Sequence, residues 1–343
     1  MKILIPLISF GKSGGIKVIS NLANYWIKQG HIVTIVTTAD DTPYYATCAE
    51  IVFITLENND KNSVLKKLYL LFNFIRRESI NYDVVLANYN LTAYPVFFGS
   101  KVRKAYYIQA YEPEFYSGIK NNPVKRIILT FIAWFTYCLP MLKIVNSDMY
   151  RSYKNIRTKN VVYPGINFDV FFPKKRSHKV KDEIFKIGCI GRQEEWKGSE
   201  DVAEAIRILH AKGLSNIELV VAFNPVSYEQ HKLVQPHGDA SLADFYRSLD
   251  IIVTPGHVQL DAIHYPVIEA MATKTPLITT GYYPSTESNC FLVPVKSAAK
   301  IAEKIQYVIE NYDHAIEKAD LAYEDTKEFS WENVSKKFIS SMN

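Results

Sequence analysis

The sequence is poor in cysteine, and the few cysteines present point away from two classes of protein. Four occur in the 343-residue chain, at positions 48, 138, 189 and 290, without the close spacing of metal ligands. Neither a zinc site nor a disulfide framework is expected, and a reduced, cytoplasmic chain is predicted. Two of the four lie in apolar contexts and are expected to be buried.

Long hydrophobic runs are also missing. The most apolar segment, 124–145, contains 16 consecutive uncharged residues at 127–142, fewer than the roughly 20 needed to span a bilayer. Pro140 lies near its end. A buried helix is the first expectation, and a helix dipping into a membrane is the alternative. The apolar N-terminal run lacks a small-residue cleavage site, which predicts a first strand and not a signal peptide.

Two glycine-rich nucleotide signatures are incomplete. Residues 11–13 (Gly-Lys-Ser) resemble the end of the phosphate loop of nucleotide hydrolases, but Pro6 stands where the first glycine is required. Gly14 and Gly15 do not complete the G-x-G-x-x-G of dinucleotide dehydrogenases. Both enzyme classes are therefore set aside.

Charge is divided unevenly along a chain whose length predicts two domains of about 150 to 170 residues. Residues 1–175 hold 22 Lys and Arg against 11 Asp and Glu, whereas the remainder holds 18 against 24. A basic first half favours an anionic partner, either a membrane surface or a phosphate-bearing acceptor. The alternative is a set of solvated lysines without a partner.

Strand and helix patterns alternate through both halves, which predicts an α/β fold with two parallel sheets. We expect two Rossmann-like doubly wound domains facing each other across a cleft. The predicted strands are 3–8, 32–37, 51–55, 84–87, 105–109, 185–190, 217–222, 251–253 and 277–279. The predicted helices are 16–29, 63–79, 199–212, 242–249, 266–273 and 298–312.

Two strand ends in the second half carry opposite charges. Arg192 and Lys197 follow strand 185–190, while Asp261 and Glu269 follow strand 251–253. Since parallel strands present their carboxyl ends at one edge, cations for phosphates would lie near carboxylates for hydroxyls. This pattern indicates a nucleotide-sugar site. Three alternatives remain: a solvated basic loop, a glutamate in the first helical turn that only serves the helix dipole, and a glycosidase carboxylate pair.

Several segments together carry a family resemblance. They are Gly191-Arg192 with Lys197-Gly198, 242–250, the acid-x7-acid segment 261–269 with its extension to 272, 163–167, and 329–332. The set resembles the retaining glycosyltransferases of GT-B fold, family four, over essentially the whole chain. Segment 106–116 is similar to one found in rhamnosyltransferases of bacterial surface glycans.

The chain departs from the family pattern at several places. Asp261, Ala262 and His264 stand where the family has a glutamate and two glycines. Gln109 replaces the family histidine, and Ala110 replaces the acid that often follows it. Side chains in place of glycine are expected to reshape the pocket for the donor sugar.

The resemblance implies transfer of a sugar, with retention, from a nucleoside diphosphate to a hydroxyl of a growing cell-surface glycan or glycolipid. A deoxyhexose donor such as dTDP-rhamnose, or a GDP- or UDP-hexose, is expected. The implied catalytic residues are Arg192, Lys197 and Asp261. The implied donor-binding residues are Gly14, Gly15, Gly191, His264, Tyr265 and Glu269. The implied acceptor-side residues are Asn88, Gln109 and Glu112.

The same resemblance implies roles for the parts of the chain. Residues 1–172 would bind the acceptor, 173–328 would bind the donor, and 329–343 would form a terminal helix packing back on the first domain. No metal, cofactor or nucleic acid is expected beyond the nucleotide-sugar substrate. Peripheral association with the anionic inner face of the cell membrane is expected. The alternative function is a non-catalytic nucleotide-sugar sensor.

Overall fold

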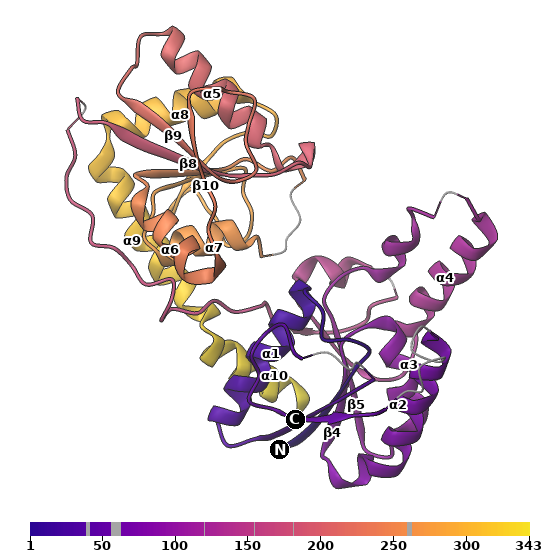
Figure 1. Ribbon diagram of the computed structural model, residues 1–343. Coiled ribbons are helices and arrows are strands. Elements are labelled where there is room, and N and C mark those ends of the chain that lie inside the picture. Colours follow the sequence, from indigo (N-terminus) through magenta and orange to yellow (C-terminus); the bar gives the residue numbers. More distant parts are fainter. Residues whose placement is uncertain (39–41, 56–62, 120, 154, 181, 259–262) are drawn as a thin grey trace. The chain divides into compact units, whose positions relative to one another are not determined.

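The chain folds into two compact α/β units, each built around a parallel sheet. The computed structural model describes residues 1–38, 42–55, 63–119, 121–153, 155–180, 182–258 and 263–343. Unit 1 comprises Met1–Gly165 and Trp331–Asn343, and unit 2 comprises Ile166–Ser330 (Figure 1). The prediction of two Rossmann-like parallel α/β domains is therefore confirmed.

Unit 1 contains a parallel sheet of strand order β3-β2-β1-β4-β5-β6-β7. Its strands are β1 (Lys2–Leu7), β2 (Ile32–Thr37), β3 (Glu50–Phe53), β4 (Val84–Ala87), β5 (Arg103–Ile108), β6 (Leu142–Val145) and β7 (Asn160–Val161). Its helices are α1 (Gly14–Lys28), α2 (Val64–Glu78), α3 (Asn90–Gly99), α4 (Pro123–Thr136) and α10 (Trp331–Met342). Parallel pairing in register, such as Ile3 with Val33, brings the carboxyl ends of β1, β4 and β5 to one edge.

Helix α1 shows why this sequence forms this element. The Ser13 side chain accepts from the Ile16 amide at 3.2 Å and caps the helix start. Apolar residues at helical spacing, among them Ile19 and Trp26, are fully buried against the sheet. Trp26 also packs edge-on against Phe338 of α10, with ring centroids 5.2 Å apart. The last helix therefore belongs to the core of unit 1.

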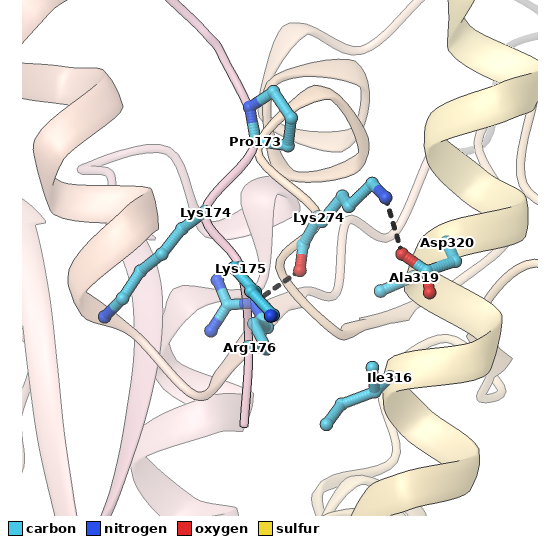
Figure 2. Close-up of a pocket in the computed structure, with 8 residues that line it drawn as sticks. All are labelled: Pro173, Lys174, Lys175, Arg176, Lys274, Ile316, Ala319 and Asp320. Carbon is cyan, nitrogen blue, oxygen red and sulfur yellow. Dashed lines mark hydrogen bonds and ion pairs between the residues drawn. The ribbon is translucent and has the colours of Figure 1, made fainter. Parts of the chain in front are cut away.

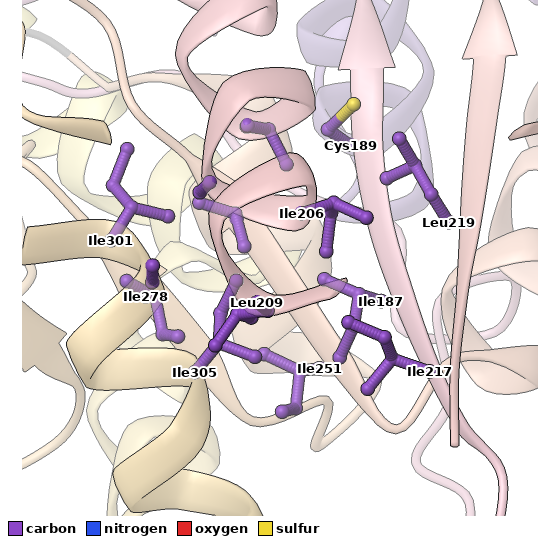
Figure 3. Packing of buried hydrophobic residues seen from close by; sticks show 14 of the residues in the cluster. Ile187, Cys189, Ile206, Leu209, Ile217, Leu219, Ile251, Ile278, Ile301 and Ile305 are labelled. Atoms are coloured by element: carbon purple, nitrogen blue, oxygen red, sulfur yellow. The ribbon is translucent and has the colours of Figure 1, made fainter. Parts of the chain in front are cut away.

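Unit 2 repeats the design with strand order β10-β9-β8-β11-β12-β13. Its strands are β8 (Phe185–Gly191), β9 (Ile217–Phe223), β10 (His231–Val234), β11 (Ile251–Thr254), β12 (Leu277–Thr279) and β13 (Phe291–Leu292). Its helices are α5 (Ser199–Ala211), α6 (Gly238–Ser248), α7 (Tyr265–Ala272), α8 (Ala298–Glu310) and α9 (Tyr312–Thr326). Figure 3 shows isoleucine and leucine side chains of α5 and α8 meeting those of the sheet. Cys189 lies in this core; Cys290 is also buried, and Cys48 and Cys138 are exposed.

The chain enters unit 2 earlier than residue 173. Residues 166–172 belong to unit 2: the Ile166 amide donates to the Phe329 carbonyl at 2.8 Å, and Phe171 packs on Tyr246. Arg176 then fixes the incoming segment by donating to the Thr275 hydroxyl at 2.7 Å and to the Leu249 carbonyl. It also donates to the Lys274 carbonyl (Figure 2). The sequence-based boundary missed these contacts because they join distant segments.

The cavity shown in Figure 2 has a volume of about 420 Å³ and lies beside the hydrogen bonds of Arg176. Most of its polar lining residues are basic. The Arg176 guanidinium is engaged by the hydrogen bonds just described, and Lys274 pairs with Asp320 at 2.7 Å. The carbonyls that Arg176 binds precede β11 and β12. This cavity therefore lies toward the amino ends of the strands, opposite the edge where predicted site residues follow β8 and β11.

The expectation of a buried helix within 124–145 is wrong. Helix α4 ends at Thr136, and the rest of the segment forms a turn and strand β6. Large apolar side chains of α4, including Ile127 and Phe131, are exposed. The composition of the segment showed that it was apolar, but burial depends on which face meets the unit. Within the described ranges, no helix combines the length and apolar character needed to cross a bilayer.

Candidate functional site

The loop after β8 is held tightly against the end of β11. Gly198 adopts a left-handed φ of 72°, and a Cβ there would lie 2.3 Å from the Pro255 carbonyl oxygen. Glycine is therefore required on two counts. The His257 amide donates to the Trp196 carbonyl at 2.8 Å, and His257 Nε2 lies 2.7 Å from Asp201 in the first turn of α5. These contacts fix the loop that carries the two predicted cations.

Arg192 and Lys197 lie close to each other on this loop. Partial burial, and then the positive charge of Arg192, lower the pKa of Lys197. The Lys197 ammonium sits 4.0 Å from the centre of the Trp196 ring, and the Arg192 guanidinium lies over Phe223. No carboxylate in the described part of the chain forms an ion pair with either cation. Two like charges on one loop are suited to bind an anion.

His264 occupies the N-cap position of α7 and faces the same two cations. Its ring stacks on Tyr282, with centroids 4.3 Å apart and planes 17° from parallel. Burial, followed by the charges of Lys197 and Arg192, lowers its pKa to about 3. The imidazole is therefore neutral at neutral pH and does not add a third positive charge.

Unpaired polar atoms lie at the end of β11 and on the segments that follow β11 and β12. Among the described residues, His264 Nδ1, the Tyr282 hydroxyl and the Thr254 hydroxyl are buried without a hydrogen-bond partner. Thr254 ends β11, and the Tyr282 hydroxyl touches Gly256, where a Cβ would lie 1.8 Å from it. Buried polar groups without partners are costly, and hydroxyl groups of a ligand would satisfy them.

Glu269 lies behind this group in α7. The helix begins at Tyr265, so Glu269 lies in the second turn and not in the first, as the sequence had suggested. This weakens the alternative that it serves only the helix dipole. Its buried carboxylate accepts from the Tyr246 hydroxyl at 2.8 Å. Burial and then the Glu269 charge raise the pKa of Tyr246, which keeps the hydroxyl protonated as a donor.

Gly191, Tyr265 and Asp261 are the remaining predicted site residues of unit 2. A Cβ on Gly191 would lie 1.7 Å from the Asn224 carbonyl oxygen, so strand packing alone demands glycine there. Tyr265 opens α7, and burial followed by the Glu269 charge raises the pKa of its phenol. Asp261 and Ala262 lie outside the described residues.

The acceptor-side residues predicted in unit 1 lie around one cavity. It measures about 480 Å³ and is lined by the residues after β1, β4 and β5 and by the start of α1. Gly15, Asn88, Gln109 and Glu112 all line it. The Gln109 amide donates to the Gly15 carbonyl at 3.3 Å. Asn88 Oδ1 is buried without a partner in the described ranges, which leaves an acceptor for a ligand hydroxyl or amide. A Cβ added at Gly14, next to this lining, would meet no described atom within 4 Å.

Glu112 supplies a carboxyl group to the lining of this cavity and is deeply buried. It accepts from the Asn90 amide at 3.1 Å and from the hydroxyls of Tyr106 and Tyr137. Burial is the largest influence and raises its pKa to about 7, although these hydrogen bonds oppose the rise. The side chain thus holds the 3-10 helix Glu112–Tyr116 against the sheet and changes charge near neutral pH.

Sequence reasoning did not assign Tyr246, Tyr282 or His257 to the site. Tyr246 lies within a segment that carried the family resemblance, so its spacing could have suggested a role. Tyr282 and His257 had no such signal, because they reach the site through tertiary contacts. Among the described residues, no group of three or more His, Cys, Asp and Glu side chains is placed to hold a metal ion.

Two parallel α/β units with ligand-type groups at the carboxyl edges of their sheets define the GT-B class of fold. Comparison with solved structures agrees. The chain superposes on sucrose-phosphate synthase from Thermosynechococcus elongatus with a TM-score of 0.73 and 15% identity, covering 99% of this chain and 97% of that one. It superposes on HepE from Anabaena in complex with UDP-glucose with a TM-score of 0.72 and 14% identity, covering 100% and 99%.

Comparison of the sequence with known families and curated proteins gives two matches. Residues 184–311 match the family described as Glycosyl transferases group 1. The chain is 25% identical over 169 residues to the capsular polysaccharide biosynthesis glycosyltransferase CapM of Staphylococcus aureus. That match spans 43% of this chain and 44% of the relative. Together, these findings show a GT-B fold and a similarity of residues 184–311 to Glycosyl transferases group 1.

Proposed function

We propose that the protein transfers a sugar, with retention of anomeric configuration, from a nucleoside diphosphate to a hydroxyl of a cell-surface glycan or glycolipid. The observation that carries the proposal is the pair Arg192 and Lys197 on the loop that follows β8, where the charge of Arg192 lowers the pKa of Lys197. The match of residues 184–311 to Glycosyl transferases group 1 and the similarity to CapM support it. The proposal includes membership of family four.

The donor's diphosphate binds Arg192 and Lys197. As the bond to the sugar breaks, negative charge develops on the departing phosphate, and preorganised cations stabilise it most at that moment. Arg192 supplies a planar fork for two phosphate oxygens, and Lys197 supplies a compact charge. Because these cations perform the task of a divalent ion, the proposed reaction needs no metal and no cofactor.

The sugar and ribose bind around α7. Glu269, oriented by Tyr246, accepts from ribose hydroxyls, and Asp261 accepts from the sugar. The unpaired polar atoms of His264 and Tyr282 give the sugar further partners in the described part of the site. The related structure of HepE holds UDP-glucose, which supports a UDP-sugar; dTDP-rhamnose and GDP-hexoses are the other proposed donors.

The acceptor binds unit 1. The cavity beside Asn88, Gln109 and Glu112 offers amide and carboxyl groups suited to a sugar hydroxyl. Gly14 and Gly15 let backbone amides at the start of α1 approach the acceptor or the leaving phosphate. We propose that the protein works in the cytoplasm at the inner face of the membrane, where an anionic surface attracts basic unit 1 and lipid-linked glycans are built.

A thermal-shift screen of nucleotide sugars and nucleoside diphosphates tests this proposal. One base is expected to raise the melting temperature selectively, because a ligand that binds only the folded state stabilises it. Lys197→Ala should reduce the shift, and Lys232→Ala, an exposed lysine on β10, should not. If no nucleotide shifts the wild type, the proposed donor site is wrong.

A nucleotide-sugar sensor remains the second candidate, since His264 and Ala262 replace glycines of the family pattern. Both functions predict the thermal shift, so turnover must separate them. Slow hydrolysis of the stabilising nucleotide sugar, or transfer to any glycan acceptor, supports the enzyme. Tight donor binding without either reaction, in the presence of a range of acceptors, supports the sensor.

A further inference from the structure

Helix α4 of unit 1 presents its apolar side chains outward. Six of them are exposed: Val124, Ile127, Ile128, Phe131, Trp134 and Phe135. At 100° per residue they fall within an arc of about 120° on the helix surface. Ala133 and Thr136, on the opposite side, are buried against the unit. An apolar stripe of this size on a folded surface marks an interaction site.

The helix also projects at its amino end. Every residue from Asn122 to Ile128 is exposed, so the first two turns have little covering them among the described residues. Figure 1 shows α4 extending at the margin of unit 1. A projecting, convex helix is suited to entering a soft layer such as the interface of a bilayer.

A groove lies along one side of the stripe. It measures about 560 Å³, and the segment after β5 forms its other wall. On the α4 side it is lined by Ile127, Phe131 and Trp134, among others. The 3-10 helix Glu112–Tyr116 borders both this groove and the polar cavity of unit 1, because Pro113 lines the groove and Phe115 lines the cavity.

The charges identify the surface that the stripe meets. Lys125 and Arg126 are exposed and flank the stripe in the first turn of α4. Residues 1–175, which include most of unit 1, hold 22 Lys and Arg against 11 Asp and Glu. This excess disfavours a second copy of the same unit and favours an anionic layer. Trp134 and Phe135 add aromatic rings of the kind that settle at the level of lipid headgroups.

We infer that α4 is a membrane-docking helix that inserts its apolar stripe into the interface of an anionic bilayer. Docking there brings the adjoining polar cavity to the lipid surface, within reach of the headgroup of a lipid-linked acceptor. The inference rests on the proposed function only in calling that headgroup an acceptor. Vesicle binding itself requires no donor and no turnover.

Co-sedimentation with vesicles tests the inference. Wild-type protein is expected to partition onto phosphatidylcholine vesicles that contain phosphatidylglycerol, and much less onto phosphatidylcholine alone. Ile127→Glu with Phe131→Glu should lower the partition by at least about tenfold, because two carboxylates oppose insertion. The control, Leu321→Glu with Val295→Glu, makes the same charge change at exposed apolar residues of unit 2 and should bind like the wild type.

Tryptophan emission gives a second readout without a charge change. Of the four tryptophans, Trp134 on α4 and Trp196 in unit 2 are exposed, whereas Trp26 and Trp331 are buried. Anionic vesicles should shift the wild-type emission to shorter wavelength. The Trp134→Phe protein should lose most of that shift but should still co-sediment with the vesicles. Equal partition of the α4 variant and the wild type overturns the inference. The inference is also overturned if the wild type binds no vesicles but forms a dimer that the α4 variant does not form.

The nucleotide thermal shift, measured on the same preparations, separates this inference from the proposed function. The α4 variant should keep the wild-type shift, since α4 lies in unit 1 and the cations lie in unit 2. Vesicle binding by a wild type that no nucleotide stabilises supports the docking helix and counts against the donor site. A nucleotide thermal shift without vesicle binding supports the donor site and counts against the docking helix.

Discussion

The two units share one architecture but differ in the chemistry at their sheet edges, and in each the local chemistry runs against the overall charge. Residues 176–343, which include most of unit 2, hold 24 acidic against 18 basic residues, yet the unit 2 edge carries Arg192 and Lys197. Unit 1 is strongly basic, yet its cavity is lined by amides and the buried Glu112. Net charge therefore indicates which surface a unit approaches, and the strand ends indicate which ligand it binds.

The sharpest test of unit 1 is its response to pH. The pKa of Glu112 rises from 4.5 to about 7 on folding, so the folded state binds a proton more tightly than the unfolded state. The stabilisation is complete below pH 4.5 and is lost as pH rises to about 7, at a cost of about 3 kcal/mol. The unfolding free energies of wild type and Glu112→Gln are measured from about pH 4 to about pH 8. We expect the wild-type value to fall relative to that of Glu112→Gln as the pH rises.

Exposed Glu114, two residues along the chain, provides the matched control. The difference between wild type and Glu114→Gln should stay nearly constant over the same range. If the difference in unfolding free energy between wild type and Glu112→Gln were also constant with pH, the Glu112 carboxyl would not be buried as described. The contrast between the two sheet edges would then no longer hold for unit 1.

The next largest effect is expected at the cations of unit 2. Losing one charged hydrogen bond costs roughly 1.5 to 3 kcal/mol, so Arg192→Ala or Lys197→Ala should slow transfer by about ten- to a hundredfold. The measurement is kcat/KM for the donor identified by thermal shift. Lys232→Ala again serves as the control. Rates at the wild-type level in both variants would remove the proposed role of this edge.

The strand of this part of the molecule was predicted well because its signals are local, and the binding roles of its two cations stay predictions. A strand, a glycine and a cation follow one another directly at 185–192, and the structure brings Arg192 and Lys197 together there. Tyr282 was missed because it reaches His264 only through the tertiary fold. Gly191 was assigned to donor binding, and the Asn224 carbonyl by itself already demands a glycine there.

Apolar segments were harder to interpret. Helix α4 and the buried helix α1 both have apolar residues at helical spacing. The α1 stripe packs on the sheet, whereas the α4 stripe is exposed. Periodicity predicts that a helix has two faces, but the choice of the buried face depends on the neighbouring elements. Strand β10 and helix α9 were also missed, the first because it is short and half exposed.

The smallest expected effect concerns Gly14, where a methyl group tests for a ligand directly. A Cβ there would have no atom of the described protein within 4 Å, so Gly14→Ala should leave stability unchanged or raise it by about 0.4 to 1 kcal/mol. If phosphate or acceptor approaches this backbone, the same methyl should reduce kcat/KM by about tenfold.

Gly118→Ala is the comparison for this last prediction, since Gly118 also has open space around it but does not line the cavity. It should change stability as little or as favourably as Gly14→Ala does, and it should not change the rate appreciably. A Gly14→Ala enzyme as active as the Gly118→Ala enzyme would show that ligands do not reach the start of α1. Unit 1 would then contribute its amide-lined cavity alone, and recognition of phosphate would belong entirely to the cations of unit 2.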